Sequence, residues 1–215
     1  MGDGDSPKQY VKGEQTRQHI LAVAKREFLE KGYLGASIRS IAKLSEVTTG
    51  AIFRYFPDKE SLFGALVSPV ADTVLSMYSA GGQQGCQLLE SGEPQKMWRI
   101  SDQFVHDFVE YLFGNKEAFA LLVNCSGGSS YERFMDRLVA EAEEQTYSFL
   151  QEMLRKGYPC KDLSREEIHI LISAQYYAIF EIVRHDLSKE DAAARLRLIG
   201  DFFRPGWNGI FGDGQ

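Results

Sequence analysis

The chain has 215 residues, of which 44% are hydrophobic and 25% are charged, and its formal net charge is −6. These values are typical of a soluble globular protein with a hydrophobic core. No apolar run reaches the roughly 18 residues that a membrane-spanning helix needs, and the polar residues 1–13 lack the apolar core of a signal peptide. We therefore expect a cytoplasmic protein without a membrane segment, in which residues 1–13 form a short disordered arm.

The negative net charge is unevenly distributed along the chain. Residues 1–66 contain 10 Lys and Arg and 8 Asp and Glu, a net charge of +2, whereas residues 67–215 contain 14 and 22, a net charge of −8. A basic N-terminal part is compatible with a nucleic-acid partner even though the whole chain is acidic.

The first predicted helix extends from Gly13 to about Lys31. Gly32 is its expected C-cap, and its apolar stripe consists of Ile20, Leu21, Ala24 and Phe28. We expect this helix to support the two shorter helices that follow it.

Two short helical patterns meet across a tight polar turn between Ser37 and Phe56. Ser37 precedes an apolar rhythm in residues 38–42 and is an N-cap signal, and a threonine before Gly50 is a second one. The turn between them has the length that a helix-turn-helix requires. In the second helix Ile52 and Phe56 share the face expected to pack, so the remaining side chains are free to contact another surface. A helical hairpin buried in an all-α core is the alternative interpretation.

The end of the second short helix adds a signal for phosphate binding. Pro57 stops that helix, Asp58 caps the next one, and Lys59 lies in its first turn. A cation at a helix N-terminus opposes the helix dipole, and a nearby phosphate would reverse that balance. Gly50 is also unusual, because glycine costs about 1 kcal/mol relative to alanine inside a helix. Its missing side chain is explained if another surface comes close.

Together these features resemble the DNA-binding domain of the TetR family of transcriptional regulators. The similarity covers residues 16–66 and includes the F-x-x-x-G-Y pattern of residues 28–33, the Ser37 helix and the run VTTGAIFRYFPDKESL of residues 47–62. The resemblance implies a homodimeric repressor whose twofold pair of helix-turn-helix units binds a pseudo-palindromic DNA operator. It also implies that a small molecule releases the operator by binding the C-terminal domain.

The predicted DNA-facing set consists of Ser37, Arg39, Thr49, Ala51, Phe53, Arg54, Tyr55 and Lys59. Base-edge contacts are expected from Thr49, Ala51 and Arg54, and phosphate contacts from Arg39, Tyr55 and Lys59. The family often has Lys at position 49 and Tyr at position 53, so this chain lacks one cation and one hydroxyl. Weaker phosphate anchoring or a different base preference is the expected consequence.

The remainder of the chain predicts helices only. A helix from Asp58 contains Pro69, at which we expect a kink that either acts in signal coupling or follows the curvature of the core, and the flexible loop Gly81–Gly85 ends it. Further helices are expected over residues 97–114, 116–125, 131–156, 168–185 and 188–203. The expected fold is all-α, with a three-helix helix-turn-helix DNA-binding domain at residues 8–66 and a helical effector-binding and dimerisation domain at residues 67–215.

The last two predicted helices carry more apolar surface than one neighbour can cover. A capping-box pattern at Ser164 and Glu167 opens the first of them, and small residues at Ala192, Ala193 and Gly200 would allow close helix approach in the second. Two such helices from each subunit would form a four-helix dimer interface. A monomer with a thick core is the alternative.

Polar and aromatic residues in the apolar stripes of the C-terminal part are the candidates for effector binding: Trp98, Phe104, Phe108, Asn124, Tyr147 and Gln175. Each also has a structural explanation, which is a hydrogen bond or dimer contact for the amides and core packing for the aromatic rings. The effector is expected to be hydrophobic or amphipathic.

No pattern in the sequence indicates an enzyme, a metal or a cofactor. The histidines at 19, 106, 169 and 185 lack metal-ligand spacing, and the cysteines at 86, 125 and 160 are far apart, which predicts reduced thiols. The segment Cys125–Ser129 is better explained as a helix C-cap and loop than as a nucleophile turn. Two other classes remain open: a helical hydrophobe-binding module, which leaves the basic N-terminal part unexplained, and a small α-helical enzyme, for which convergent titratable residues are lacking.

Overall fold

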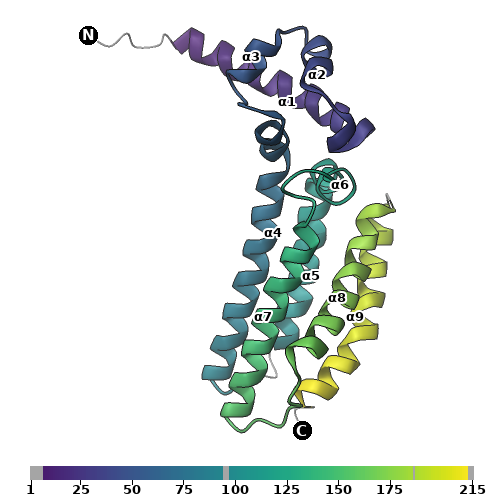
Figure 1. The fold of residues 1–215 in the computed structure, drawn as a ribbon. Helices are drawn as coiled ribbons and strands as arrows, with labels where there is room; N and C mark the ends of the chain where they lie inside the picture. The colour runs from purple at the N-terminus through teal and green to yellow at the C-terminus, as the bar shows by residue number, and fades with distance from the viewer. Residues whose placement is uncertain (1–6, 94–96, 186, 213–215) are drawn as a thin grey trace, which may run out of the picture. The chain divides into compact units, whose positions relative to one another are not determined.

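A computed structural model describes residues 7–93, 97–185 and 187–212. All regular secondary structure in these ranges is helical, which confirms the all-α fold expected from the sequence (Figure 1). The helices are α1 (Pro7–Gly35), α2 (Ile38–Leu44), α3 (Thr49–Phe53), α4 (Lys59–Glu90), α5 (Met97–Gly114), α6 (Lys116–Asn124), α7 (Phe134–Arg155), α8 (Arg165–Arg184) and α9 (Lys189–Phe211).

The chain forms two compact units that are not simple halves of the sequence. The first contains the residues up to Pro69 and the segment Ala120–Glu132, and the second contains Val70–Phe119 and the residues from Arg133 onward. The sequence-based division is a single cut between residues 66 and 67. It therefore does not include the end of α6 and the following loop, which pack within the first unit.

α1 begins earlier than the sequence pattern indicates. The expectation of a disordered arm is wrong for residues 7–13, because the helix starts at Pro7, whose fixed φ is compatible with a first helical turn. The predicted C-cap is confirmed, since Gly32 has a φ of 68° and interrupts the helix in the left-handed region. The side chains of Ile20, Ala24 and Phe28 are fully buried and anchor α1 in the first unit.

α2 and α3 form the predicted helix-turn-helix, and side chains define where each helix begins. The Ser37 hydroxyl accepts a hydrogen bond from the Ser40 N–H group at 3.1 Å, and the Thr48 hydroxyl accepts one from the Ala51 N–H group at 3.1 Å. Glu46, in the turn between the helices, has a φ of 54°, which is uncommon for a residue other than glycine. The turn is thus tight and locally specified.

α4 continues through the glycines that we expected to end it. The helix is unbroken from Lys59 to Glu90, so the prediction of a flexible loop at Gly81–Gly85 is wrong. Glycine costs about 1 kcal/mol relative to alanine in a helix, but packing here outweighs propensity. A Cβ atom on Gly82 would overlap the side-chain amide of Gln145 in α7, so the missing side chain permits the two helices to approach.

α9 similarly passes through a proline at which we expected it to end. It extends to Phe211 rather than stopping near Phe203, with Pro205 inside the helix. Trp207 is 7% exposed, and its Nε1–H group donates a hydrogen bond to the Gln175 side chain of α8 at 2.7 Å. These contacts offset the backbone hydrogen bond that a proline removes.

α4 is more apolar than the sequence analysis expected. Among the described residues it is the one helix long and apolar enough to cross a membrane, and 33% of its most apolar window is buried. Its most deeply buried residues, each at most 2% exposed, are Leu62, Phe63, Val67, Val70, Ala71, Val74 and Leu89. The core helix of a globular protein has the same composition.

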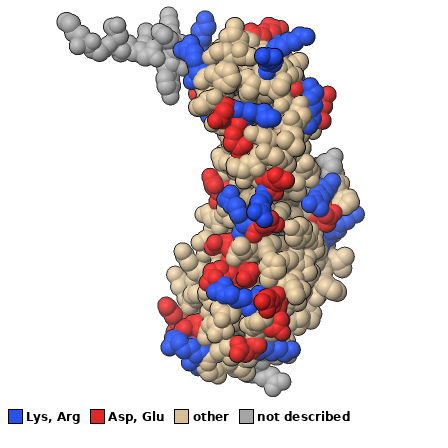
Figure 2. All heavy atoms as spheres, viewed as in Figure 1, with Lys and Arg blue, Asp and Glu red and all other residues tan. Residues whose placement is uncertain are grey.

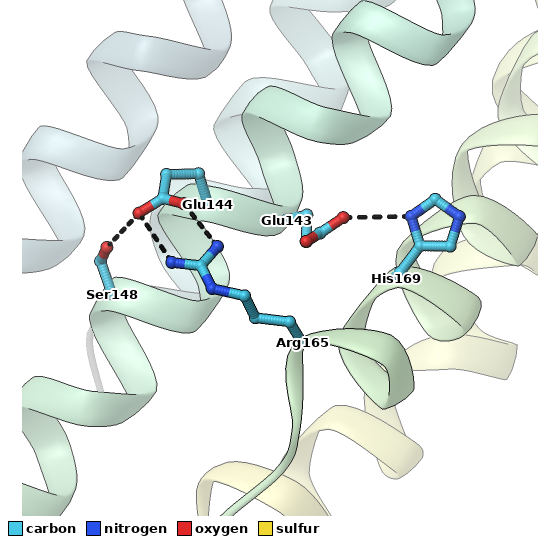
Figure 3. A network of polar contacts seen from close by, with 5 residues as sticks. All are labelled: Glu143, Glu144, Ser148, Arg165 and His169. Atoms are coloured by element: carbon cyan, nitrogen blue, oxygen red, sulfur yellow. Dashed lines mark hydrogen bonds and ion pairs between the residues drawn. The ribbon is translucent and has the colours of Figure 1, made fainter.

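α7 and α8 are joined at their surface by a network of polar side chains (Figure 3). Arg165 donates hydrogen bonds to both carboxylate oxygens of Glu144, at 2.5 Å and 3.3 Å, and Ser148 donates to the same carboxylate at 3.3 Å. His169 Nδ1 lies 3.0 Å from Oε2 of Glu143. The network orients α8 on α7, although its exposure to water limits its contribution to stability.

Candidate nucleic-acid interface

α3 has a buried and an exposed side. Ile52 is fully buried and Phe56 is 3% exposed, which confirms the predicted packing face. The helix ends at Phe53, three residues before the predicted end, because the N–H groups of Tyr55 and Phe56 both donate to the Ile52 carbonyl at 2.9 Å. This tight last turn leaves the side chains around it on the surface of the first unit.

The eight predicted DNA-facing residues all retain some exposure to water. Exposed positions are Ser37, Arg39, Phe53 and Arg54, and partly buried ones are Thr49, Ala51, Tyr55 and Lys59. Neither Arg39 nor Arg54 forms a side-chain hydrogen bond or ion pair with a described residue. These guanidinium groups can therefore bind a phosphate or a base edge without breaking contacts within the protein.

Two apolar positions of α3 also suit an outside partner. Phe53 is 48% exposed, and an exposed ring in a major-groove helix can contact the methyl group of thymine. Gly50 is not required by packing within the protein, because the nearest atom to an added Cβ would be the Thr48 hydroxyl oxygen at 3.8 Å. A surface that approaches from outside remains the explanation for this glycine.

The structure gives Lys59 partners that the sequence does not indicate. Its Nζ group donates hydrogen bonds to the backbone carbonyl oxygens of Tyr33, at 2.8 Å, and Ala36, at 3.2 Å, and lies 4.3 Å from the centre of the Tyr33 ring. These hydrogen bonds to carbonyl oxygens at and just after the end of α1 offset the unfavourable interaction between the Lys59 charge and the dipole of α4. An ammonium group has three donors, so one remains for a phosphate, and the phosphate contact of Lys59 stays a prediction.

Basic side chains do not gather into one broad patch on the face drawn in Figure 2, where Lys and Arg are interspersed with Asp and Glu. On this face phosphate binding would therefore depend on single Lys or Arg side chains rather than on a continuous basic surface. This agrees with the net charge of only +2 in residues 1–66.

A loop from late in the sequence docks on the helices of the first unit. The N–H group of Tyr33 donates to the Cys125 carbonyl at 2.7 Å, and the Ser130 N–H and hydroxyl groups donate to Glu60 Oε1 at 3.0 Å and 2.5 Å. The Tyr131 ring packs edge-on against Phe63, with ring centroids 6.2 Å apart. α7 begins at Phe134 rather than at the predicted residue 131, because residues 126–131 form this docked loop.

Two titratable groups respond to this docking. Burial, with a further contribution from the hydrogen bond to Glu60, raises the pKa of Tyr33 to about 12. Burial alone would raise the pKa of Glu60, but the hydrogen bonds from Ser130 and Tyr33 outweigh it and the pKa lies below its ordinary value of 4.5. Glu60 is therefore a carboxylate that holds the loop through its charge.

The structure describes the side chains of four of the six predicted effector residues, and the effector role of the set stays a prediction. The side chains of Trp98 and Phe104 lie outside the described residues, and Phe108 is a core residue that packs against other aromatic rings. Asn124 is exposed, the Arg165 guanidinium carbon lies 4.2 Å from the centre of the Tyr147 ring, and Gln175 accepts the hydrogen bond of Trp207. For Gln175 the structural interpretation is thus observed.

Two pockets in the second unit were not predicted. One, of about 590 Å³, lies between α5 and α9, and its lining combines apolar residues with charged ones, among them the ion pair of Lys189 and Glu110 at 2.7 Å. The other, of about 130 Å³, is formed by α4, α7, α8 and the end of α9. The glycines of α4 were a signal for the second pocket that we interpreted as a loop.

Metal and thiol chemistry find little support in the described part of the chain. It contains no group of three or more His, Cys, Asp or Glu residues that could hold a metal ion. Cys86, Cys125 and Cys160 are free. Burial raises the pKa of the Cys125 and Cys160 thiols, which makes both less reactive.

These observations define a class of protein. A helix-turn-helix whose second helix has an exposed side is a motif that places this helix in the major groove of DNA. The family model "Bacterial regulatory proteins, tetR family" matches residues 20–66, which identifies this part of the chain as a DNA-binding domain of the TetR type.

Individual relatives agree with this assignment. The chain is similar to the HTH-type transcriptional repressor AcnR of Corynebacterium glutamicum, with 41% identity over 79 residues that cover 37% of this chain and 39% of AcnR. It is 47% identical to the HTH-type transcriptional regulator AcrR of Shigella flexneri over 53 residues, 25% of each protein. The chain thus spans about two fifths or less of the length of these relatives. The solved structure of NalD from Pseudomonas aeruginosa shares the fold over 94% of this chain and 98% of NalD, with a TM-score of 0.62 and 18% identity.

Proposed function

We propose that this protein is a cytoplasmic transcriptional repressor that binds a pseudo-palindromic operator as a homodimer and is released by a small hydrophobic or amphipathic effector. The observation that carries the proposal is the outward side of α3, where Phe53 and Arg54 are exposed beside Gly50, which the protein's own packing does not require. The helix-turn-helix match of residues 20–66 supports it.

Within this proposal the DNA-facing residues have different roles. Thr49, Ala51 and Arg54 contact base edges, and Arg54 has the geometry for a bidentate contact with guanine. Arg39, Tyr55 and Lys59 bind phosphates and set the orientation of α3 without specifying sequence.

The proposed dimer interface involves α8 and α9. Large apolar side chains on these helices are strongly exposed in the single chain, namely Ile170 at 65%, Tyr177 at 43%, Leu198 at 68% and Phe202 at 76%. Burying such a set against the same helices of a second subunit would form a twofold four-helix contact.

Two segments are candidates to couple effector binding to the DNA-binding helices. α6 begins in the second unit, and from Ala120 it belongs to the first unit, whose loop is held by Glu60. Pro69 lies at the other boundary between the units, inside α4. Pro69→Ala with unchanged DNA affinity and effector response would remove Pro69 from this role.

The test is a selection of bound sequences from random DNA duplexes by the full chain near physiological salt. We expect enrichment of one pseudo-palindromic sequence, since two symmetric α3 helices contact two half-sites. Recovery of no common sequence, with affinity no higher than for bulk DNA, would refute the DNA-binding role and favour a hydrophobe-binding module.

A further inference from the structure

The smaller pocket of the second unit has a well-defined construction. It has a volume of about 130 Å³ and is lined by Gly81, Gly82, Gly85, Ala142, Gln145, Thr146, Phe149, Tyr176 and Phe211. We propose that it binds a neutral single-ring aromatic molecule with one hydrogen-bond donor, such as a phenol, and that this is the effector site. Its regulatory consequence rests on the proposed function, whereas the binding itself does not.

The walls of the pocket are aromatic and held in place by other rings. Phe211 packs edge-on against Phe149 and in a stacked arrangement against Trp207, with ring centroids 5.6 Å apart in both pairs. Tyr176 is 7% exposed and lies 5.0 Å from Tyr78 between ring centres. Aromatic walls of this kind favour a flat aromatic ligand.

The end of α9 that carries Phe211 is anchored to the loop before α8. The N–H group of Lys161 donates to the Ile210 carbonyl at 2.8 Å. Gly212 lies so close to the backbone of Pro159 that an added Cβ would overlap the Pro159 carbonyl oxygen. The aromatic wall is therefore preformed, which reduces the entropy lost when a ligand binds.

The floor of the pocket is the glycine segment of α4. Three glycines in one helix cost about 1 kcal/mol each relative to alanine, so their presence calls for a contact that side chains would block. At Gly82 that contact is the Gln145 amide. The remaining bare backbone at Gly81 and Gly85 provides a flat surface beside the rings.

The polar atoms of the lining select the ligand's charge and polarity. Nε2 of Gln145 donates to Glu141 at 2.8 Å, which orients the amide so that Oε1 faces Gly82 and is left as an acceptor. The ligand therefore needs a donor such as a hydroxyl group. The lining has no Lys, Arg, Asp or Glu, and a charged ligand would lose its hydration without an opposite charge.

The size of the pocket sets the size of the ligand. A closed apolar cavity of about 150 Å³ holds benzene, so a pocket of about 130 Å³ that is open to solvent accommodates at most about one ring, whose substituent can extend through the opening. The larger pocket between α5 and α9 combines charged groups of both signs with apolar residues, so it can also pair an ionic ligand.

The test is isothermal titration calorimetry of the full chain with phenol, benzoate and benzylammonium. We expect saturable binding of phenol at one site per chain and at least about tenfold weaker binding of both ions, because the lining offers neither charge an opposite charge. Equal affinities for the three compounds, or no binding of phenol, would overturn the assignment.

Variants locate the site. Gln145→Leu removes the acceptor, and Gly82→Ala displaces the Gln145 amide, so each should weaken phenol binding about tenfold, the value of one hydrogen bond. Gly114→Ala is the matched control, since the position is open and lies outside the pocket, and it should bind phenol like the wild type. Circular dichroism verifies that each variant is folded, and equal phenol affinity in all three would refute the site.

Operator binding separates the two proposals. Phenol binding with the expected variant pattern supports the pocket whether or not the chain selects a DNA sequence. Sequence-selective DNA binding without phenol binding refutes the pocket and leaves the repressor proposal intact.

Discussion

The helix-turn-helix and the long helices of the second unit reach their structures by different routes. In the first, local side chains define the helix ends: Ser37 and Thr48 cap α2 and α3, and Asp58 accepts a hydrogen bond from the Ser61 N–H group at 2.6 Å at the start of α4. In the second unit, α4 and α9 continue through residues that normally end helices. Local signals are sufficient where polar caps occur, and tertiary packing decides the helix ends elsewhere.

The largest expected effect tests whether the first unit is stabilised mainly by its helix N-caps or by its buried core. Phe63 is fully buried and packs against the rings of Phe28, Tyr33 and Tyr131, with ring centroids 5.0, 5.2 and 6.2 Å away. Phe63→Ala should lower the free energy of unfolding by about 3–5 kcal/mol, measured by urea denaturation. The exposed Leu44→Ala is the control, with a change within about 0.5 kcal/mol. A loss below about 1 kcal/mol for Phe63→Ala would mean that caps dominate there.

The next effect concerns DNA rather than stability. Arg54→Ala should weaken binding to the selected sequence by about 1–3 kcal/mol and relax its sequence preference, because it would remove the base contact that we propose for Arg54. Lys59→Ala should instead weaken all sequences alike and reduce the salt dependence. Anisotropy titrations at several salt concentrations measure both, and a change of preferred sequence in Lys59→Ala would contradict the assigned roles.

The pH dependence of stability tests the loop held by Glu60. The folded-state pKa of Glu60 is lowered, so its stabilising contribution is complete above the ordinary value of 4.5 and is lost as the pH falls through the lower folded value. We expect the wild type to lose roughly 1 kcal/mol more stability than Glu60→Gln between pH 7 and pH 3. Parallel acid losses in the two proteins would show that the carboxylate does not hold Ser130.

Replacing a glycine by alanine should stabilise the protein in the helix-turn-helix and destabilise it in the second unit. Gly50→Ala meets no close atom and should stabilise the protein by up to about 1 kcal/mol while weakening DNA binding. In Gly212→Ala the new Cβ would overlap the backbone of Pro159, and residue 212 has a φ of 79°, which is unfavourable for alanine. The substitution should therefore destabilise the second unit by roughly 1 kcal/mol or more. Thermal denaturation measures both, and unchanged DNA affinity in Gly50→Ala would rule out a close DNA surface there.

The smallest expected effect is at the exposed α7–α8 network of Figure 3. The side chains of Arg165 and Glu144 are 48% and 58% exposed, so water screens their attraction. Arg165→Ala should leave the free energy of unfolding nearly unchanged in urea denaturation. A loss as large as that of Phe63→Ala would mean that the network is a major determinant of α8 packing.

The sequence predicted the parts of the fold that depend on local chemistry. The cap at Ser37, the left-handed Gly32 and the capping box of Ser164 and Glu167 are confirmed. The sequence indicated a threonine cap before Gly50, and the structure shows that this threonine is Thr48. Each involves residues at most a few positions apart, for which one side chain and one backbone group decide the conformation.

The parts that could not be predicted depend on partners distant in sequence. Gly82 appeared to be a helix breaker because its contact, Gln145, lies in another helix. Lys59 appeared to be unpaired because its acceptors include the Tyr33 carbonyl, 26 positions earlier. The docking of Ser130 on Glu60 joins residues 70 positions apart, and no periodicity indicates it.

The most direct test of the DNA-binding role is an anisotropy titration of the full chain onto its selected duplex, with excess bulk DNA near physiological salt. We predict saturable binding with two protomers, or a multiple of two, per site, a loss of tenfold or more in Arg54→Ala, and wild-type affinity in the exposed control Arg133→Ala. Binding no tighter than to bulk DNA, or an Arg54→Ala variant that binds like the wild type, would contradict the assignment of α3 as the DNA-reading helix.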